Sequence, residues 1–251
     1  MRLVIFFLTA WLPQRAEPSV EEILAKIQTN TSQFLQSLPD FVCDETITSK
    51  AVIRGRQRQY VNESHFVGRQ QKQGRMTFTE TREVISINGK AVPKNTRPQG
   101  PIFFGGGFSS VLHTTFGKDT VAAQTYKVAS EEEFRGRPTL VIEFSTRPGQ
   151  QDLRFDFDGK VYVENDRGKA WIDKESMRIL RLERQYLNVP RRQSPMVATV
   201  EYGEAQIGGQ AYWMPVTVTA SQVKGSTGDE EQYVAQYRNY RKFEAQSSII
   251  Y

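Results

Sequence analysis

Beyond residue 40, apolar and polar residues alternate along most of the chain. Residues 140–144 and 153–157 show the pattern clearly, with leucine, isoleucine or phenylalanine at every second position. Successive side chains of a β-strand point to opposite faces, so this period predicts strands with one apolar face. The same argument predicts further strands over residues 41–53, 57–68, 75–87, 121–129, 177–187, 196–206, 210–220 and 230–240.

Two dipeptides between these segments are typical of tight hairpin turns. Asn88-Gly89 follows residues 84–87, and Asp158-Gly159 separates residues 153–157 from residues 161–163. Both turn residues tolerate a positive φ, which two-residue hairpin loops require. Because the other connections are also short, the strands are expected to form an antiparallel meander.

One amphipathic helix is predicted before the first strand. Ser19 and Glu22 have the spacing of a capping box, in which each side chain accepts a hydrogen bond from an unpaired backbone amide. The polar, helix-poor stretch 29–32 favours a bend, and Pro39 ends the helix. Its apolar positions fall on one face and therefore need a covering partner, for which the sheet is the natural choice: Val20, Ile23, Leu24, Ile27, Phe34, Leu35 and Leu38.

A second, short helix is predicted around residues 108–116, after an aromatic and glycine-rich connection. The glycine run Gly105, Gly106 and Gly107 allows wide backbone freedom, while Phe103 and Phe104 before it disfavour exposure to water. Two interpretations stay open. The glycines form the hinge of a lid with an apolar underside, or the segment is an ordinary connection whose aromatic rings complete the core.

These elements predict a mainly β protein with few helices, of the α+β class. Alternating strands with a polar outer face need a cover for their inner face, and the sequence offers few helices to provide it. The antiparallel sheet is therefore expected to curve strongly, covered by the N-terminal helix and the short lid helix. Residues that would face the space between sheet and helices, and line an apolar cavity there, are Ile23, Ile27, Phe34, Phe103, Phe104, Phe108, Leu112, Trp171 and Trp213.

The first sixteen residues have the character of a secretory signal peptide. Arg2 precedes a largely apolar run of ten residues, 3–12, and Pro13 follows it. A membrane-spanning helix needs about 20 apolar residues, so cleavage is expected, with Ala16 as the site although Gln14 and Arg15 match the usual pattern weakly. The expected organisation is a signal peptide over residues 1–16 and one domain over residues 17–251, which places the protein in the bacterial periplasm or outside the cell.

The net charge adds little to these expectations. It is +5 for the whole chain and falls to +3 when Arg2 and Arg15 leave with the signal peptide. Arginines recur in the sequence, either as a solvated sheet face or as a basic surface that contacts anionic membranes peripherally: Arg54, Arg56, Arg58, Arg191, Arg192, Arg238 and Arg241. A nucleic-acid partner is not expected outside the cytoplasm, and the protein is expected to be a monomer.

The residues give no pattern of a catalytic or metal site. The histidines are His65 and His113, the lone cysteine is Cys43, and no nucleophile elbow or phosphate-binding loop is present. Cys43 has no partner for an intrachain disulfide and is expected to be a buried thiol. We therefore expect a protein that is not an enzyme, with no catalytic residues, no metal ligands and no cofactor.

Three stretches resemble exported bacterial proteins of the LolA-like lipoprotein-carrier superfamily. They are Leu38-Pro-Asp-Phe-Val, Gly168-Lys-Ala-Trp-Ile-Asp and Tyr237-Arg-Asn-Tyr-Arg-Lys-Phe243, and the segment Trp213-Met-Pro215 is also similar. With the strand order, the resemblance covers most of residues 18–251. It implies an incomplete β-barrel with helices on its concave side and an apolar cavity between them. Members of the superfamily carry lipoprotein acyl chains or bind envelope-stress regulators.

Two functions follow as hypotheses. The first is an exported, non-catalytic binding protein for a lipid, an acyl chain or another apolar ligand, similar to a lipoprotein carrier. The alternative is a protein-interaction module or regulator of the cell envelope, with a protein partner and no small-molecule ligand. Because fold does not determine function, no binding residue is transferred from the superfamily.

Overall fold

A computed structural model gives the structure of the chain. It describes residues 18–73, 75–105, 107–118, 120–150, 153–157, 160–187, 195–224 and 227–243, without the side chains of residues 71–77, 153–164 and 224. The predicted signal peptide, Gly106 of the predicted hinge and the predicted turn Asp158-Gly159 lie outside the described residues.

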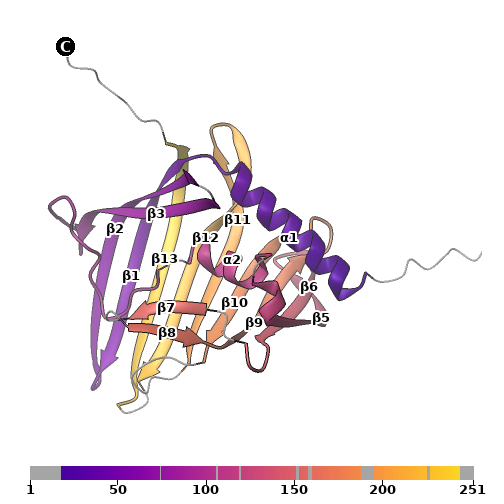
Figure 1. Cartoon of the computed structure of the whole chain (residues 1–251). Helices are drawn as coiled ribbons and strands as arrows, with labels where there is room; N and C mark the ends of the chain where they lie inside the picture. The colour runs from indigo at the N-terminus through magenta and orange to yellow at the C-terminus, as the bar shows by residue number, and fades with distance from the viewer. Residues whose placement is uncertain are drawn as a thin grey trace, which may run out of the picture.

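Eleven strands form one antiparallel sheet, in the spatial order β4-β3-β2-β1-β13-β12-β11-β10-β9-β6-β5 (Figure 1). Strands β7 (Leu153–Phe157) and β8 (Lys160–Glu164) form a separate hairpin. The strands of the large sheet are β1 (Phe41–Ile53), β2 (Arg56–Gln73), β3 (Arg75–Ile87), β4 (Lys90–Ala91), β5 (Gln124–Phe134), β6 (Arg137–Thr146), β9 (Asp166–Asp173), β10 (Ile179–Tyr186), β11 (Met196–Ile207), β12 (Gln210–Lys224) and β13 (Asp229–Lys242).

The sheet curves but does not close, and the predicted fold class is confirmed. Strand β13 pairs with β1, so the last strand of the chain lies beside the first, while β4 and β5 form the two ends of the strand order. Helix α1 (Val20–Ser37) and the short helix α2 (Ser110–Phe116) lie on the concave side (Figure 1). The predicted strand 121–129 begins only at Gln124, because residues 121–123 form a 3₁₀ turn.

Helix α1 begins as the sequence predicts. The Ser19 hydroxyl accepts a hydrogen bond from the Glu22 amide (3.2 Å), and the Glu22 carboxylate accepts one from the Ser19 amide (2.9 Å). The expected bend over residues 29–32 does not interrupt the helix, which continues to Ser37. Ile23 and Ile27 are buried against the concave side.

Aromatic rings fill the concave side beneath the connection to α2. Phe108 is fully buried and packs against Phe41 and Phe66, with ring centres 5.3 and 4.9 Å away. Tyr237 of β13 meets the Phe108 ring edge to face at 5.5 Å. This part of the concave side is therefore a packed core, contributed by strands from both ends of the chain.

A buried ion pair fixes helix α2 to the sheet. The Arg184 guanidinium of β10 pairs with the Asp166 carboxylate of β9, and both side chains are buried. Asp166 also accepts hydrogen bonds from Gln124 (2.9 Å) and Thr146 (2.6 Å). Since Arg184 donates in addition to the Thr114 hydroxyl of α2, one charged pair connects four strands and the helix.

Replacement of Arg184 by methionine should destabilise the protein strongly. Arg184→Met removes the cation and leaves the Asp166 carboxylate buried without its counter-ion, a change that costs about 3–5 kcal/mol of unfolding free energy. Urea denaturation followed by circular dichroism measures this difference.

Arg241→Met is the matched control. Arg241 pairs with Asp44 at 3.2 Å, but both side chains are nearly half exposed, so its loss should cost less than about 1 kcal/mol. Equal effects of the two substitutions would contradict the structural role assigned to Arg184.

Candidate functional site

A hollow of about 220 Å³ lies between helix α1 and strands β10 to β12. We call it the α1 hollow. The helix supplies one wall, the three strands supply the floor, and the connection between β9 and β10 supplies part of the rim. Its lining residues are Ile27, Asn30, Thr31, Gln33, Phe34, Ser37, Leu112, Met177, Arg178, Ile179, Tyr202, Ala211, Tyr212 and Trp213.

The walls of the α1 hollow combine apolar and aromatic side chains with polar ones, most of which belong to α1. Trp213 is held in place because its indole nitrogen donates to the Ile179 carbonyl at 2.7 Å, which leaves the ring to line the hollow. Ile27 and Leu112 close the inner end from the two helices, and both are buried. A large aromatic ring with one satisfied polar group suits the mouth of an apolar pocket.

Asn30 connects the middle of α1 to the turn between β9 and β10. Its side-chain amide donates to the carbonyls of Ser176 (3.0 Å) and Met177 (2.9 Å). A second, more open hollow of about 450 Å³ lies along the same contact and shares Asn30 and Met177 with the first. Asn30 therefore stands between two hollows that follow the helix.

The turn that receives Asn30 is organised by Asp173. The Asp173 carboxylate accepts hydrogen bonds from the Ser176 amide (2.7 Å) and hydroxyl (2.8 Å), and it pairs with Arg137 at 3.2 Å. Burial raises the pKa of Asp173, but the bonds from Ser176 and Arg137 outweigh it and hold the pKa below its ordinary value. The ionised carboxylate thus fixes the carbonyls to which Asn30 donates.

The C-terminal end of α1 is attached to β2. The Gln70 side-chain amide donates to the carbonyls of Leu35 (2.8 Å) and Leu38 (2.6 Å), and the Asp40 carboxylate accepts from the Gln70 amide (2.9 Å). These bonds satisfy carbonyls that a helix end leaves unpaired. Among the described residues, the Asn30 and Gln70 side chains thus make the polar attachments of α1 to the sheet, and neither attachment involves an ion pair.

The structure brings together four of the residues predicted to line a cavity: Ile27, Phe34, Leu112 and Trp213 line the α1 hollow. Ile23 is buried one helical turn before Ile27. Phe104 and Phe108 are buried in the core, whereas Phe103 is half exposed.

Trp171 lies on the other face of the sheet, and this placement corrects the prediction that it lines the cavity. Its ring contacts Phe134 with centres 6.2 Å apart, and the Arg181 guanidinium lies 4.9 Å from its centre. The neighbours Ala170 and Ile172 point inward instead and are fully buried. Since the sequence is apolar at three successive positions here, alternation alone gives no face for Trp171.

The glycine-rich connection before α2 is bonded to the sheet at several points. Ser49 exchanges two hydrogen bonds with Ile102, and Glu80 accepts from both the amide (3.0 Å) and the hydroxyl (2.6 Å) of Ser109. Gly107 is buried, and a Cβ there would stand 2.6 Å from the Val218 side chain. These contacts agree with the interpretation that the connection completes the core, and movement about the glycines stays a prediction.

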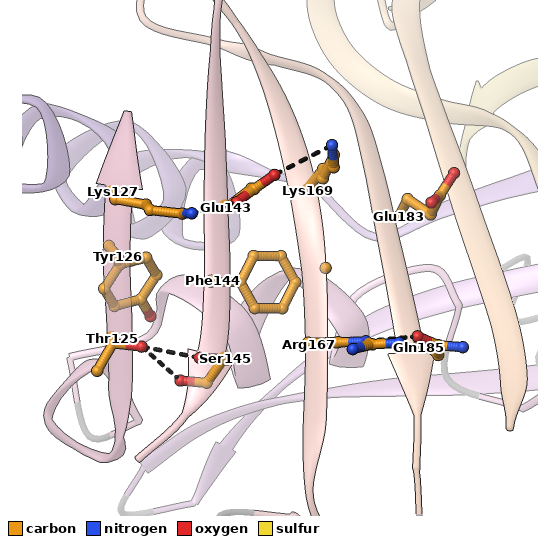
Figure 2. Close-up of a pocket in the computed structure, with 11 residues that line it drawn as sticks. Thr125, Tyr126, Lys127, Glu143, Phe144, Ser145, Arg167, Lys169, Glu183 and Gln185 are labelled. Atoms are coloured by element: carbon orange, nitrogen blue, oxygen red, sulfur yellow. Dashed lines mark hydrogen bonds and ion pairs between the residues drawn. The ribbon is translucent and has the colours of Figure 1, made fainter. Parts of the chain in front are cut away.

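A shallow furrow on the outer face crosses β5, β6, β9 and β10 (Figure 2). Glu143 stands at its centre between Lys127 (2.8 Å) and Lys169 (3.1 Å), and their hydrogen bonds lower the pKa of Glu143. Arg167 donates to Gln185 at 2.6 Å in the next row of side chains. Because these groups satisfy one another across the strands, the furrow has the character of a solvated sheet face.

The described residues contain no group of three or more histidine, cysteine, aspartate or glutamate side chains that could hold a metal ion. His65 lies 3.5 Å from Asp44, and the pKa of Asp44 is lowered by hydrogen bonds from Asn239 and Arg241. Cys43 is buried, and burial raises the pKa of its thiol. In the part of the chain that is described, no helix combines the length and apolar character needed to cross a bilayer.

Sequence reasoning missed Asn30, Asp173, Arg178 and Tyr202. Asn30 belongs to the polar stretch 29–32, for which the sequence predicts a bend. At helical spacing it shares a face with Ile27 and Phe34, and a polar side chain on a covered face needs a hydrogen-bond partner. The sequence Asp173-x-x-Ser176 could have indicated the turn, because aspartate side chains often bond the backbone of following residues.

The fold and the hollow together define an open, curved antiparallel sheet with a helix laid over an apolar concave side. No protein-family model and no curated protein sequence matches the chain. Among solved structures, it is similar to a DUF1329-family protein of Desulfovibrio piger, with 13% identity, a TM-score of 0.46, and coverage of 91% of this chain and 95% of that one.

Two further solved structures bear on the resemblance found in the sequence. A putative outer-membrane lipoprotein-sorting protein domain of Vibrio parahaemolyticus has 12% identity and a TM-score of 0.40, with coverage of 89% of this chain and 93% of that one. A LolA-superfamily protein of Nitrosomonas europaea has 10% identity and a TM-score of 0.37, with coverage of 89% and 94%. These are distant likenesses in fold alone, and no residue role is transferred from any of these proteins.

Loss of the Asn30 amide should loosen helix α1 selectively. Asn30→Ala removes two hydrogen bonds between the helix and the β9–β10 turn, which together contribute about 1–2 kcal/mol. Hydrogen exchange of peptides from residues 20–37 should become faster, while exchange in β1 stays unchanged. Thr29→Ala is the control, because the Thr29 hydroxyl bonds within the helix to Ala25, and faster exchange in that variant would contradict the role of Asn30.

Asp173→Asn should lower stability at neutral pH and lose this effect in acid. The native pKa of Asp173 lies below its ordinary value of 3.8, so the unfolded state binds more protons in this range and the stabilisation disappears as the pH falls below about 4. Urea denaturation at about pH 7 and about pH 3 should show a large difference from the unmodified protein at the first pH and a small one at the second. Glu175→Gln changes an exposed carboxylate of the same turn and should leave the stability close to that of the unmodified protein at both pH values. A loss of stability in Asp173→Asn that is equal at the two pH values would contradict the assignment.

Proposed function

We propose that this protein is an exported, non-catalytic binding protein that takes up an apolar chain in the α1 hollow. The observation that carries the proposal is the hollow itself, which opens beside an amphipathic helix and is lined by Ile27, Phe34, Leu112 and Trp213. These four side chains offer an apolar surface to a chain of methylene groups, and each buried methylene contributes about 0.8 kcal/mol. The predicted signal peptide supports a location in the periplasm or outside the cell.

The size of the hollow bears on how a ligand enters. Its volume of about 220 Å³ is below the roughly 300–1,000 Å³ of typical ligand pockets. A long chain therefore requires α1 to move away from the floor. The helix is suited to this movement because, in the described part of the chain, its polar attachments to the sheet are made by neutral side-chain amides, those of Asn30 and Gln70. Outward movement would also join the α1 hollow to the second hollow along the helix.

The alternative function, a protein-interaction module, has one feature in its favour. Strand β5 lies at the end of the strand order and pairs only with β6 in the described sheet, so its other edge could receive a partner strand. However, β5 carries three successive acidic residues, 131–133, and a register shift between Val128 and Ser130. Charges and bulges of this kind protect edge strands from pairing, so we rank this function second.

Uptake of a fluorescent fatty acid by the purified protein tests the proposal, together with native mass spectrometry of the protein as isolated. Ala211 is small, exposed and lines the hollow, so Ala211→Trp should fill the entrance and lower the affinity at least about tenfold with little loss of stability. Ala91→Trp is the matched control, because Ala91 is also exposed but lies on β4 at the far end of the strand order.

Binding that Ala211→Trp weakens and Ala91→Trp leaves unchanged would support the α1 hollow as the site. Protein that is isolated without a ligand and also fails to take up fatty acid would overturn the proposal. Equal losses in both variants would overturn the location of the site.

A further inference from the structure

Two arginines lie beside Trp213 at the mouth of the α1 hollow, and they differ in whether an acid neutralises them. The guanidinium carbons of Arg137 and Arg178 each lie 5.8 Å from the centre of the Trp213 ring. Arg137 is neutralised by Asp173 at 3.2 Å. Arg178 lines the hollow directly, and its side chain is exposed.

The charge of Arg178 has no carboxylate partner among the described residues. Of the acids nearby, Asp173 pairs with Arg137, and Glu131 pairs with Lys174 at 2.6 Å. Glu175 lines the second hollow and not the first. Arg178 is also the one charged residue in the described lining of the α1 hollow, so the lining has a net positive charge.

A second hydrogen-bond donor is buried at the floor of the hollow. Tyr202 is 4% exposed and lines the floor, and its hydroxyl has no hydrogen-bond partner within the described part of the chain. Burial raises the pKa of Tyr202, so the hydroxyl keeps its proton and stays a donor. A buried donor without an acceptor costs about 1–3 kcal/mol, a cost that an oxygen atom of a ligand would remove.

We propose that the α1 hollow selects amphiphiles that have one apolar chain and an oxyanion head group. Arg178 and Tyr202 donate hydrogen bonds to the head, and the chain lies against Ile27, Phe34 and Trp213. The chemistry fits because a guanidinium donates paired hydrogen bonds to carboxylate or phosphate oxygens. A neutral sugar or alcohol head would supply no negative charge to pair with Arg178. This inference rests on the proposed function and adds the class of head group.

The test compares probes that share one chain and differ in the head. Dodecanoate, dodecyl phosphate and dodecyl maltoside are titrated calorimetrically below their micelle concentrations, with acetate as a head group without a chain. Both anionic probes should bind about tenfold more tightly than the maltoside, and the difference should narrow with added salt. The ratio of the two anionic affinities identifies a carboxylate or a phosphate head, and acetate should not compete.

Two variants assign the effect to the named donors. Arg178→Glu should weaken dodecanoate about tenfold and change the maltoside little, whereas Arg56→Glu, an exposed arginine of β2, should change neither. Tyr202→Phe should weaken dodecanoate while the unfolding free energy of the free protein stays equal or rises, because the substitution removes an unsatisfied hydroxyl. A merely structural role of Tyr202 would lower stability instead.

The possible failures are distinguishable. If no amphiphile binds, the proposed function fails and this inference fails with it. If dodecanoate and dodecyl maltoside bind equally, or if Arg178→Glu leaves the affinity for dodecanoate unchanged, the apolar site stands and the head-group inference is overturned.

Discussion

The structure depends on covering the concave face of a sheet that curves without closing. Such a face collects apolar side chains from many strands, and water would occupy it unless helices and loops fill it. Three segments do so here: α1, α2 and the connection before α2. Because polar groups of a covering segment must also be satisfied, each segment is held by a particular set of polar contacts, and the strength of these contacts decides which cover can move.

The local features of this arrangement could be predicted from the sequence. The alternation beyond residue 40 identified most strands of the sheet, although it missed β9 and the two-residue β4, and Ser19 with Glu22 identified the start of α1. The period of the helix placed Ile23 and Ile27 on its buried face, where the structure has them. Patterns of this kind succeed because they depend on neighbours in the sequence and on which side of one element meets water.

The remainder depends on contacts between distant segments, for which a single sequence has no signal. In the stretch Ala170-Trp171-Ile172, all three residues are apolar, so only the pairing of β9 with β6 and β10 decides that Trp171 faces outward. Arg184 looks like a surface residue until Asp166 is brought beside it. The same holds for Asn30, whose acceptors lie 146 and 147 residues further along the chain.

The contrast between the two helices explains why the hollow lies where it does. Helix α2 is fixed by the fully buried Arg184 side chain, and separation of that charge from Asp166 would expose both to an apolar interior at high cost. Helix α1 is held by the amides of Asn30 and Gln70, whose hydrogen bonds water can replace at a net cost of about 1 kcal/mol each. Of the two helical covers, α1 is therefore the one with the weaker polar attachment, and this contrast is why the proposed ligand is placed in the space beneath α1 and not beneath α2.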